Sequence, residues 1–197
     1  MNEKAWGCAL DSLKTESEAI ADIAGYLEKE PFLKAAEILG RCGKIITSGC
    51  GGSGIAAKKF AHSLCCIERD AYFLPPSEAL HGGLGCIKEA DAVVLLSRGG
   101  KTAELLPIVS LCNKKKAVLI AVTENMDSPM AKGAQIVLPM KIRRESDPLD
   151  IMTTSSFVAA AAIFDALLSA VMILTGYRLE QFGPVHPGGA VGEMLNN

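Results

Sequence analysis

The sequence predicts an α/β fold of the doubly wound class, with a parallel five-stranded sheet flanked by helices in three layers. Short apolar runs alternate with helical segments from residue 44 onward, and continuous apolar runs are typical of parallel strands buried on both faces. A glycine-rich turn joins the first run to the helix after it. With 197 residues the chain has the length of one domain. We therefore expect a single domain over residues 1–197, with an N-terminal helical arm at 1–41 and an α/β core at 42–197.

The arm is predicted to be an amphipathic helix. Its apolar residues recur at spacings of three, four and seven between charged residues, namely Leu10, Leu13, Ile20, Ile23 and Leu27. Pro31 is expected to end this helix, and a shorter helix is expected to follow to about Arg41. The pattern indicates packing or dimer formation and assigns no chemistry to the arm.

The core is predicted to alternate strands and helices. Strands are expected at 45–48, 71–74, 92–97, 117–122 and 135–138, with helices from about Ser53, Thr102 and Asp127. Residues 157–175 are apolar enough to raise a membrane span, but Asp165 lies within them and four hydroxyl residues precede them. We therefore expect no membrane contact, and a helix that is buried in the core or at a subunit interface.

The composition and net charge of the chain limit the classes of partner that we expect. The formal net charge is -2 and 49% of the residues are hydrophobic, which argues against nucleic acid as a partner. The seven cysteines are odd in number and form no C-x-x-C pair, and the chain has only three histidines. We interpret the cysteines as reduced thiols of a cytoplasmic protein, with no metal site and no disulfide frame. No signal peptide is expected, because acidic residues follow the first residues closely.

The turn between the first strand and its helix is a candidate anion site. Gly49, Gly51, Gly52 and Gly54 surround Ser53, and the first N–H groups of a helix have no intrahelical acceptor. These groups and the helix dipole favour a phosphate. The alternative is a tight turn that binds nothing.

Three phosphate motifs compete for this turn. The glycines satisfy G-x-G-x-x-G, but the acid that a dinucleotide site requires after the second strand is missing, because Pro75-Pro76-Ser77 ends that strand. A P-loop would need a lysine and a hydroxyl residue where Ile55 and Ala56 stand. A phosphate monoester on a small molecule is the better interpretation.

Two further segments offer donors. Ser97 and Thr102 flank Gly99 and Gly100 in a loop after the third strand, where Arg98 or Lys101 would supply positive charge. Hydroxyl residues also open the long apolar helix: Thr153, Thr154, Ser155 and Ser156. For that cluster, helix N-capping alone is the competing interpretation.

The motifs together resemble the SIS (sugar isomerase) domain family, and within it the arabinose-5-phosphate isomerases of the KdsD/KpsF type. The resemblance rests on the glycine-rich turn, the S-x-x-G-x-T loop, and three further segments: P-S-E-A-L-H-G-G-L-G (76–85), E-S-D-P-L-D-I-M-T-T-S-S (145–156) and H-P-G-G-A-V-G (186–192). It implies reversible conversion of an aldose phosphate into a ketose phosphate through an enediol, with no cofactor. The implied substrate resembles arabinose 5-phosphate, and the implied assembly is a homodimer or homotetramer. The CBS domains that often follow in this family are not in the sequence.

The resemblance also implies the site residues. Glu145 is the expected base, and His81 and His186 are expected to open the ring and move protons. The expected phosphate-binding residues are Gly51, Gly52, Ser53, Ser97, Arg98, Gly100, Lys101, Thr102, Thr154 and Ser155. From the residues alone, Glu145 also fits a solvated charged loop, and a histidine in a loop is usually polar surface. His62, on a predicted helix face, is interpreted as structural.

Two departures from the family pattern leave a second function open. Gly52 stands where relatives commonly have a lysine, and Gly99 where they tend to have a serine. The loss of the lysine and the serine weakens the predicted binding of phosphate. Arg98 would compensate by donating two hydrogen bonds from its guanidinium to the phosphate. The alternative to an isomerase is a non-catalytic module that senses a phosphorylated sugar. A dinucleotide-dependent oxidoreductase is a third and weaker hypothesis.

Overall fold

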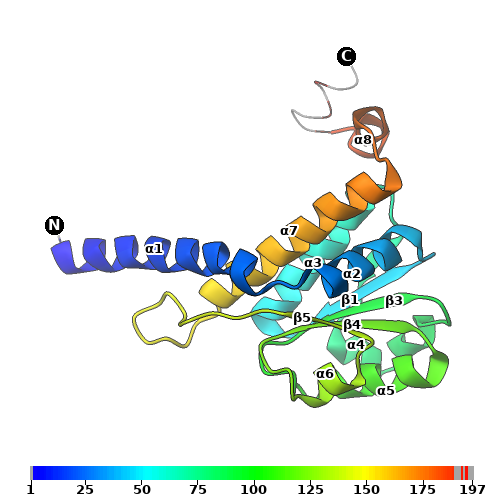
Figure 1. Ribbon diagram of the computed structural model, residues 1–197, viewed down its shortest axis with the longest axis horizontal. Helices are drawn as coiled ribbons and strands as arrows, with labels where there is room; N and C mark the ends of the chain where they lie inside the picture. The colour runs from blue at the N-terminus through cyan, green and yellow to red at the C-terminus, as the bar shows by residue number, and fades with distance from the viewer. Residues whose placement is uncertain (1, 189–191, 193, 195–197) are drawn as a thin grey trace.

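A computed structural model describes residues 2–188, 192 and 194. Within this part, five parallel strands form one sheet in the order β2-β1-β3-β4-β5, with helices on both faces (Figure 1). The strands are β1 (Ile45–Gly49), β2 (Ala71–Phe73), β3 (Ala92–Leu96), β4 (Val118–Thr123) and β5 (Ile136–Pro139). This confirms the predicted doubly wound, three-layer fold, and the strand order is that of flavodoxin-like sheets.

Helices of the two faces differ in length. One face carries α2 (Lys29–Arg41), α3 (Gly51–Cys66) and α7 (Ser155–Thr175), and the other carries α4 (Pro76–Leu80), α5 (Leu106–Lys115) and α6 (Pro129–Gly133) (Figure 1). The remaining helices are α1 (Glu3–Tyr26), α8 (Leu179–Val185) and the 3₁₀ helix η1 (Gly83–Cys86). Part of α1 packs on α7, and the start of α1 extends away from the sheet (Figure 1).

Each strand contributes to both cores, because successive side chains point to opposite faces of a sheet. In β3, Val94 and Leu96 join the core under α2, α3 and α7, whereas Val93 and Leu95 join the core under α5 and α6. Every residue of β3 is buried. The continuous apolar runs in the sequence are the direct consequence of this two-sided burial.

Proline explains two of the helix boundaries that differ from the predictions. Pro31 lies in the first turn of α2 and does not end α1, which stops at Tyr26. Pro107 likewise sits in the first turn of α5, so that helix starts at Leu106 and not near Thr102. The first turn tolerates proline because its N–H groups have no intrahelical acceptor. Residues 97–105 are therefore a longer loop than expected.

Helix α7 is long and apolar enough to span a membrane by length and composition alone. Eight of its residues are buried within the protein, among them Ala159, Ile163 and Phe164. Phe164 stacks on Phe60 of α3 with ring centroids 4.4 Å apart and an interplanar angle of 3°. The predicted core helix is thus confirmed, and α3 and α7 pack as one layer.

We expect Phe164→Ala to lower the free energy of unfolding by about 3–5 kcal/mol, because both stacked rings are fully buried and a cavity would remain. Denaturant unfolding measures this change. Ile173→Ala on the same helix is the matched control, since Ile173 is 83% exposed. Equal effects of the two substitutions would contradict the packing described above.

Candidate functional site

The site is built where β1 and β3 end side by side. Gly49, the last residue of β1, is in register with Leu96, the last residue of β3. The glycine-rich turn and the loop that starts at Ser97 therefore leave the sheet at the same level. In open α/β sheets this carboxyl edge is where ligands bind.

The glycine-rich turn is held by close backbone contact. Gly51 has a φ of +55°, which side chains rarely adopt, and a Cβ on Gly54 would lie 2.5 Å from the carbonyl oxygen of Gly49. Helix α3 starts directly at Gly51, two residues earlier than predicted. The N–H groups of Gly51, Gly52 and Ser53 are thus in its first turn, as an anion site requires.

The second loop is organised around its two hydroxyls. Ser97 Oγ and Thr102 Oγ1 are 2.9 Å apart and share a hydrogen bond, and Ser97 Oγ also accepts from the N–H of Gly100 at 3.1 Å. Gly100 has a φ of +62°, and a Cβ there would collide with the hydroxyl of Ser128. Lys101 is exposed. The predicted S-x-x-G-x-T loop therefore forms a compact turn with both hydroxyls on one side of it.

Glu145 is buried and does not lie in a solvated charged loop. It is 3% exposed, and its carboxylate accepts hydrogen bonds from five donors. The N–H groups of Thr154 and Ser156 donate at 3.0 Å each, both hydroxyls of these residues also donate, and Arg98 Nη1 donates at 3.0 Å. The carboxylate therefore satisfies the first turn of α7 and binds the second loop to it through Arg98.

This environment keeps Glu145 ionised. Burial raises the pKa of its carboxyl, but the hydrogen bonds from Ser156 and Thr154 lower it by more, so the net pKa lies below the ordinary value. A general base works best with a pKa near the working pH. The Glu145 carboxylate is therefore ionised, and its hydrogen bonds hold the start of α7 and Arg98 in place; its expected role as the base stays a prediction.

Arg98 is occupied by two carboxylates. Its Nε donates to Glu124 at 2.7 Å while its Nη1 donates to Glu145. The predicted bidentate fork for phosphate is thus turned toward protein side chains in this structure. Arg98 therefore links the second loop, on which it lies, to Glu124 after β4 and to Glu145 beside the first turn of α7.

The side chain of Thr153 fills the space beside Gly52. A Cβ on Gly52 would lie 2.6 Å from Cγ2 of Thr153 and 2.9 Å from its Cβ. Any side chain at position 52 would therefore need Thr153 to move. The contact also joins the glycine-rich turn to the segment before α7. All three predicted donor segments thus meet at one place, through this contact and through the Arg98–Glu145 pair.

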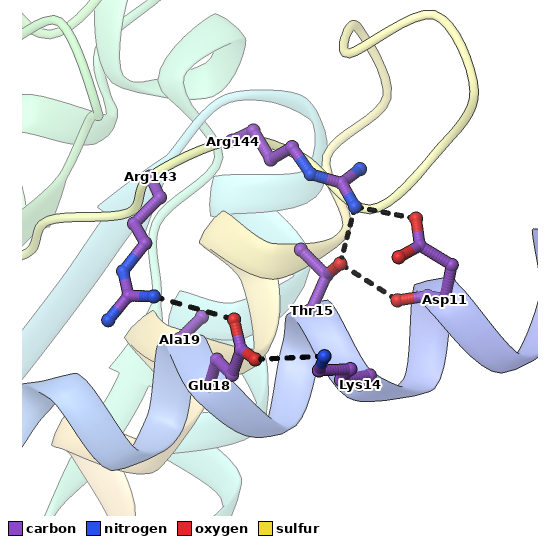
Figure 2. A pocket seen from close by; sticks show the side chains of 7 residues that line it. All are labelled: Asp11, Lys14, Thr15, Glu18, Ala19, Arg143 and Arg144. Atoms are coloured by element: carbon purple, nitrogen blue, oxygen red, sulfur yellow. Dashed lines mark hydrogen bonds and ion pairs between the residues drawn. The ribbon is translucent and has the colours of Figure 1, made fainter.

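Helix α1 holds the segment that carries Glu145. Arg144 donates to Asp11 at 2.6 Å and to Thr15 at 2.7 Å, and Arg143 pairs with Glu18 (Figure 2). These side chains line a cavity of about 180 Å³. Ser146 Oγ adds a hydrogen bond to Glu16 at 2.8 Å. Arg143 and Arg144, which precede Glu145 in the sequence, therefore bind α1. The cationic side chains that line this cavity are paired with carboxylates.

A larger cavity, of about 430 Å³, opens beside the glycine-rich turn. Two charged residues that the sequence analysis did not select line it: Lys58, on the α3 face that also carries Ile55, and Glu104, from the end of the second loop. Ser77 and Cys50 line it as well. The signal for Lys58 was its position four residues after Gly54, one helical turn from the phosphate-binding end.

Neither of the two expected histidines lines this cavity. His81 is exposed at the end of α4. His186 contacts Cys66, at the far end of α3 from Gly51, and 15 helical rises of 1.5 Å separate these ends by about 22 Å. Within the described part of one chain, His186 is therefore not brought to the glycine-rich turn, whereas His81 follows the helix whose first residues, Pro76 and Ser77, line the cavity. Ser155 is fully buried, and its hydroxyl has no hydrogen-bond partner among the described residues.

Comparison with known proteins gives a consistent picture. A family model described as SIS domain matches residues 38–170. Arabinose 5-phosphate isomerase GutQ of Salmonella typhimurium is 39% identical over 170 residues, which make up 85% of this chain and 53% of that protein. The chain thus spans about half the length of the curated relatives it matches.

Two solved structures agree over nearly the whole chain. A Listeria monocytogenes protein described as a candidate sugar-phosphate isomerase has a TM-score of 0.92 and 41% identity, covering 95% of this chain and 99% of its own. An Escherichia coli CFT073 protein in complex with A5P has a TM-score of 0.87 and 26% identity, covering 95% of this chain and 100% of its own.

We expect Glu145→Gln to lower the free energy of unfolding at pH 7 by roughly 1.5–3 kcal/mol, because a charged acceptor of several hydrogen bonds is lost. The folded-state pKa of Glu145 is lowered, so its contribution is present above the ordinary carboxyl pKa and is lost as the pH falls through the folded-state value. The difference in unfolding free energy between wild type and variant should therefore shrink as the pH falls below about 4.3, the ordinary pKa of a glutamate, toward the lower folded-state value.

Denaturant unfolding at several pH values measures this effect. Glu89→Gln is the control, because Glu89 is exposed and makes no hydrogen bond among the described residues. A difference that stays constant with pH would contradict the role of the Glu145 charge.

Proposed function

The chain belongs to the SIS domain family, and from this premise we propose that it is an aldose-ketose isomerase acting on a phosphorylated sugar. The observation that carries the proposal is the meeting of three donor segments, Gly51–Ser53, Ser97–Thr102 and Thr154–Ser156, at the carboxyl edge of the sheet. The substrate we propose is a pentose phosphate like arabinose 5-phosphate, with a product like ribulose 5-phosphate. The activity of relatives such as GutQ supports this choice.

The phosphate would bind between the first turn of α3 and the second loop. The N–H groups of Gly51, Gly52 and Ser53 have no intrahelical acceptor there, and the hydroxyls of Ser97 and Thr102 can donate once they stop bonding each other. Gly100, Lys101, Thr154 and Ser155 would complete the phosphate site. The buried Ser155 hydroxyl, which lacks a partner among the described residues, would gain an acceptor.

The sugar would extend from the phosphate into the cavity beside the turn. The reaction moves the C2 proton of the aldose to C1, while a hydroxyl proton moves from O2 to O1, so no redox cofactor is needed. Glu104 lines the cavity and, within the described residues, its carboxylate accepts no hydrogen bond. We assign proton transfer between C2 and C1 to Glu104, and the positioning of Arg98 and α7 to Glu145. The competing assignment, implied by the family resemblance, makes Glu145 the base.

The histidines would act from a neighbouring subunit. His186 contacts Cys66, which lies about 22 Å along α3 from the glycine-rich turn of its own chain, so we assign it a role in ring opening or proton movement only at the site of a second copy. Helix α1 exposes Trp6, Leu10 and Leu13, which is consistent with a homodimer or homotetramer. His81 is exposed and accessible to such a partner. We place the protein in the cytoplasm, with a small phosphorylated sugar as its partner.

We expect the purified protein in heavy water to exchange the C2 or C1 proton of a pentose phosphate for deuterium, because an enediol intermediate exposes that position to solvent-derived protons. NMR of a panel of pentose, hexose and heptose phosphates measures this. Exchange would support the isomerase. A rise in melting temperature with no exchange would instead support a phosphosugar sensor, an alternative favoured by the space at Gly52 being filled by Thr153.

We expect Glu104→Gln to lower turnover by at least about 100-fold with little change in substrate affinity or stability, because it removes a base from an exposed position. Glu89→Gln is again the matched control. Steady-state kinetics together with ligand-induced melting shifts separate the effects. Full activity of Glu104→Gln, with a stable but inactive Glu145→Gln, would return the base to Glu145.

A further inference from the structure

The far end of α3 carries a cluster of metal-binding side chains. His62 and Cys66 are four residues apart and face the same side of the helix, and His186 reaches them from the segment after α8. Cys66 Sγ lies 3.7 Å from Nε2 of His62 and 3.7 Å from Nε2 of His186. The three ligand atoms lie within 4.8 Å of one another.

The two sulfur-to-nitrogen spacings match those of a tetrahedral zinc site. A sulfur about 2.3 Å and a nitrogen about 2.0 Å from Zn²⁺ would lie about 3.5 Å apart at the tetrahedral angle. Both sulfur-to-nitrogen distances are within a few tenths of an ångström of this value. One thiolate and two imidazoles are also a donor set that suits zinc and not the oxygen-preferring Mg²⁺ or Ca²⁺.

The third side chain is held in place by contacts that do not involve a metal. The His186 ring stacks on Phe182, with centroids 4.1 Å apart and an interplanar angle of 12°. Two hydrogen bonds tie the same segment to the end of α3, from Tyr177 Oη to the carbonyl of Cys66 at 2.8 Å and from Gln181 Nε2 to Glu68 at 2.6 Å. The cluster therefore joins two segments that are already packed together.

We propose that His62, Cys66 and His186 bind a divalent zinc ion, with a fourth position left for water or another ligand. The site links the C-terminal segment to α3, at the opposite end of that helix from the glycine-rich turn. A bound metal would add a cross-link between positions 120 residues apart in the chain, and would stabilise the folded state in proportion to its affinity.

A nucleophilic thiol is the competing interpretation of the same three residues. The Nδ1 atom of His186 has no hydrogen-bond partner among the described residues, so no group there orients the imidazole as a base for the thiol. Metal binding fits the cluster better, because a metal ion would displace the thiol proton.

Titration with Co²⁺, which replaces Zn²⁺ and reports sulfur ligation, tests the proposal. We expect one Co²⁺ per chain, with a thiolate-to-cobalt charge-transfer band that added Zn²⁺ abolishes and Mg²⁺ does not. Cys66→Ser should remove the band. His62→Ala should lower the affinity for both metals by at least about 10–100-fold, the usual loss when even an outer partner of a metal ligand is changed.

Cys65→Ser is the matched control, because Cys65 is adjacent and exposed but is not part of the cluster. It should keep both the band and the affinity. No band in the wild type, a band that survives in Cys66→Ser, or a band lost in Cys65→Ser would each overturn the proposal. The readout is an absorption spectrum and not turnover, so failure of the zinc site is distinguishable from failure of the proposed isomerase, in which zinc and catalysis would compete for His186.

Discussion

The structure depends on burying one carboxylate, that of Glu145. A charge that is 3% exposed is tolerated only when hydrogen-bond donors and an opposite charge surround it. Here the donors come from the first turn of α7 and the charge comes from Arg98 on the second loop. Satisfying this single group therefore fixes two of the three donor segments relative to each other. The contact between Thr153 and Gly52 then adds the third segment, the glycine-rich turn.

The strands and the loops that follow them could be predicted from the sequence, because each is determined by a short stretch of neighbouring residues. Continuous apolar runs located the five strands, and residues that follow strand ends, such as Ser97, were placed at the carboxyl edge by the parallel topology alone. The errors at Pro31 and Pro107 have one cause: proline stops a helix interior but is accepted in a first turn. From the sequence alone, a proline that ends one helix is not distinguished from a proline in the first turn of the next helix.

The environment of Glu145 could not be predicted, because its partners are distant in the chain. Arg98 lies 47 residues away, and the neighbouring Arg143 and Arg144 suggested a solvated loop. In the structure those two arginines are used by α1, which leaves Glu145 to be buried. The environment of His186 could not be predicted for the same reason, because Cys66, which it contacts, lies 120 residues earlier in the chain. Side chains that meet through the fold, and not through a local motif, carry no signal in a single sequence.

The same arrangement limits how a dianionic phosphate can be neutralised. Position 52 holds no lysine, Thr153 fills the space beside it, and Arg98 is paired with two carboxylates. The positive end of the α7 dipole is already used by Glu145, so phosphate binding must rely mainly on the first turn of α3. Lys58 lies one turn further along that helix and lines the cavity. Together with Lys101 of the second loop, Lys58 is a cation near the turn that forms no ion pair among the described residues, so it is available to offset the charge of a phosphate.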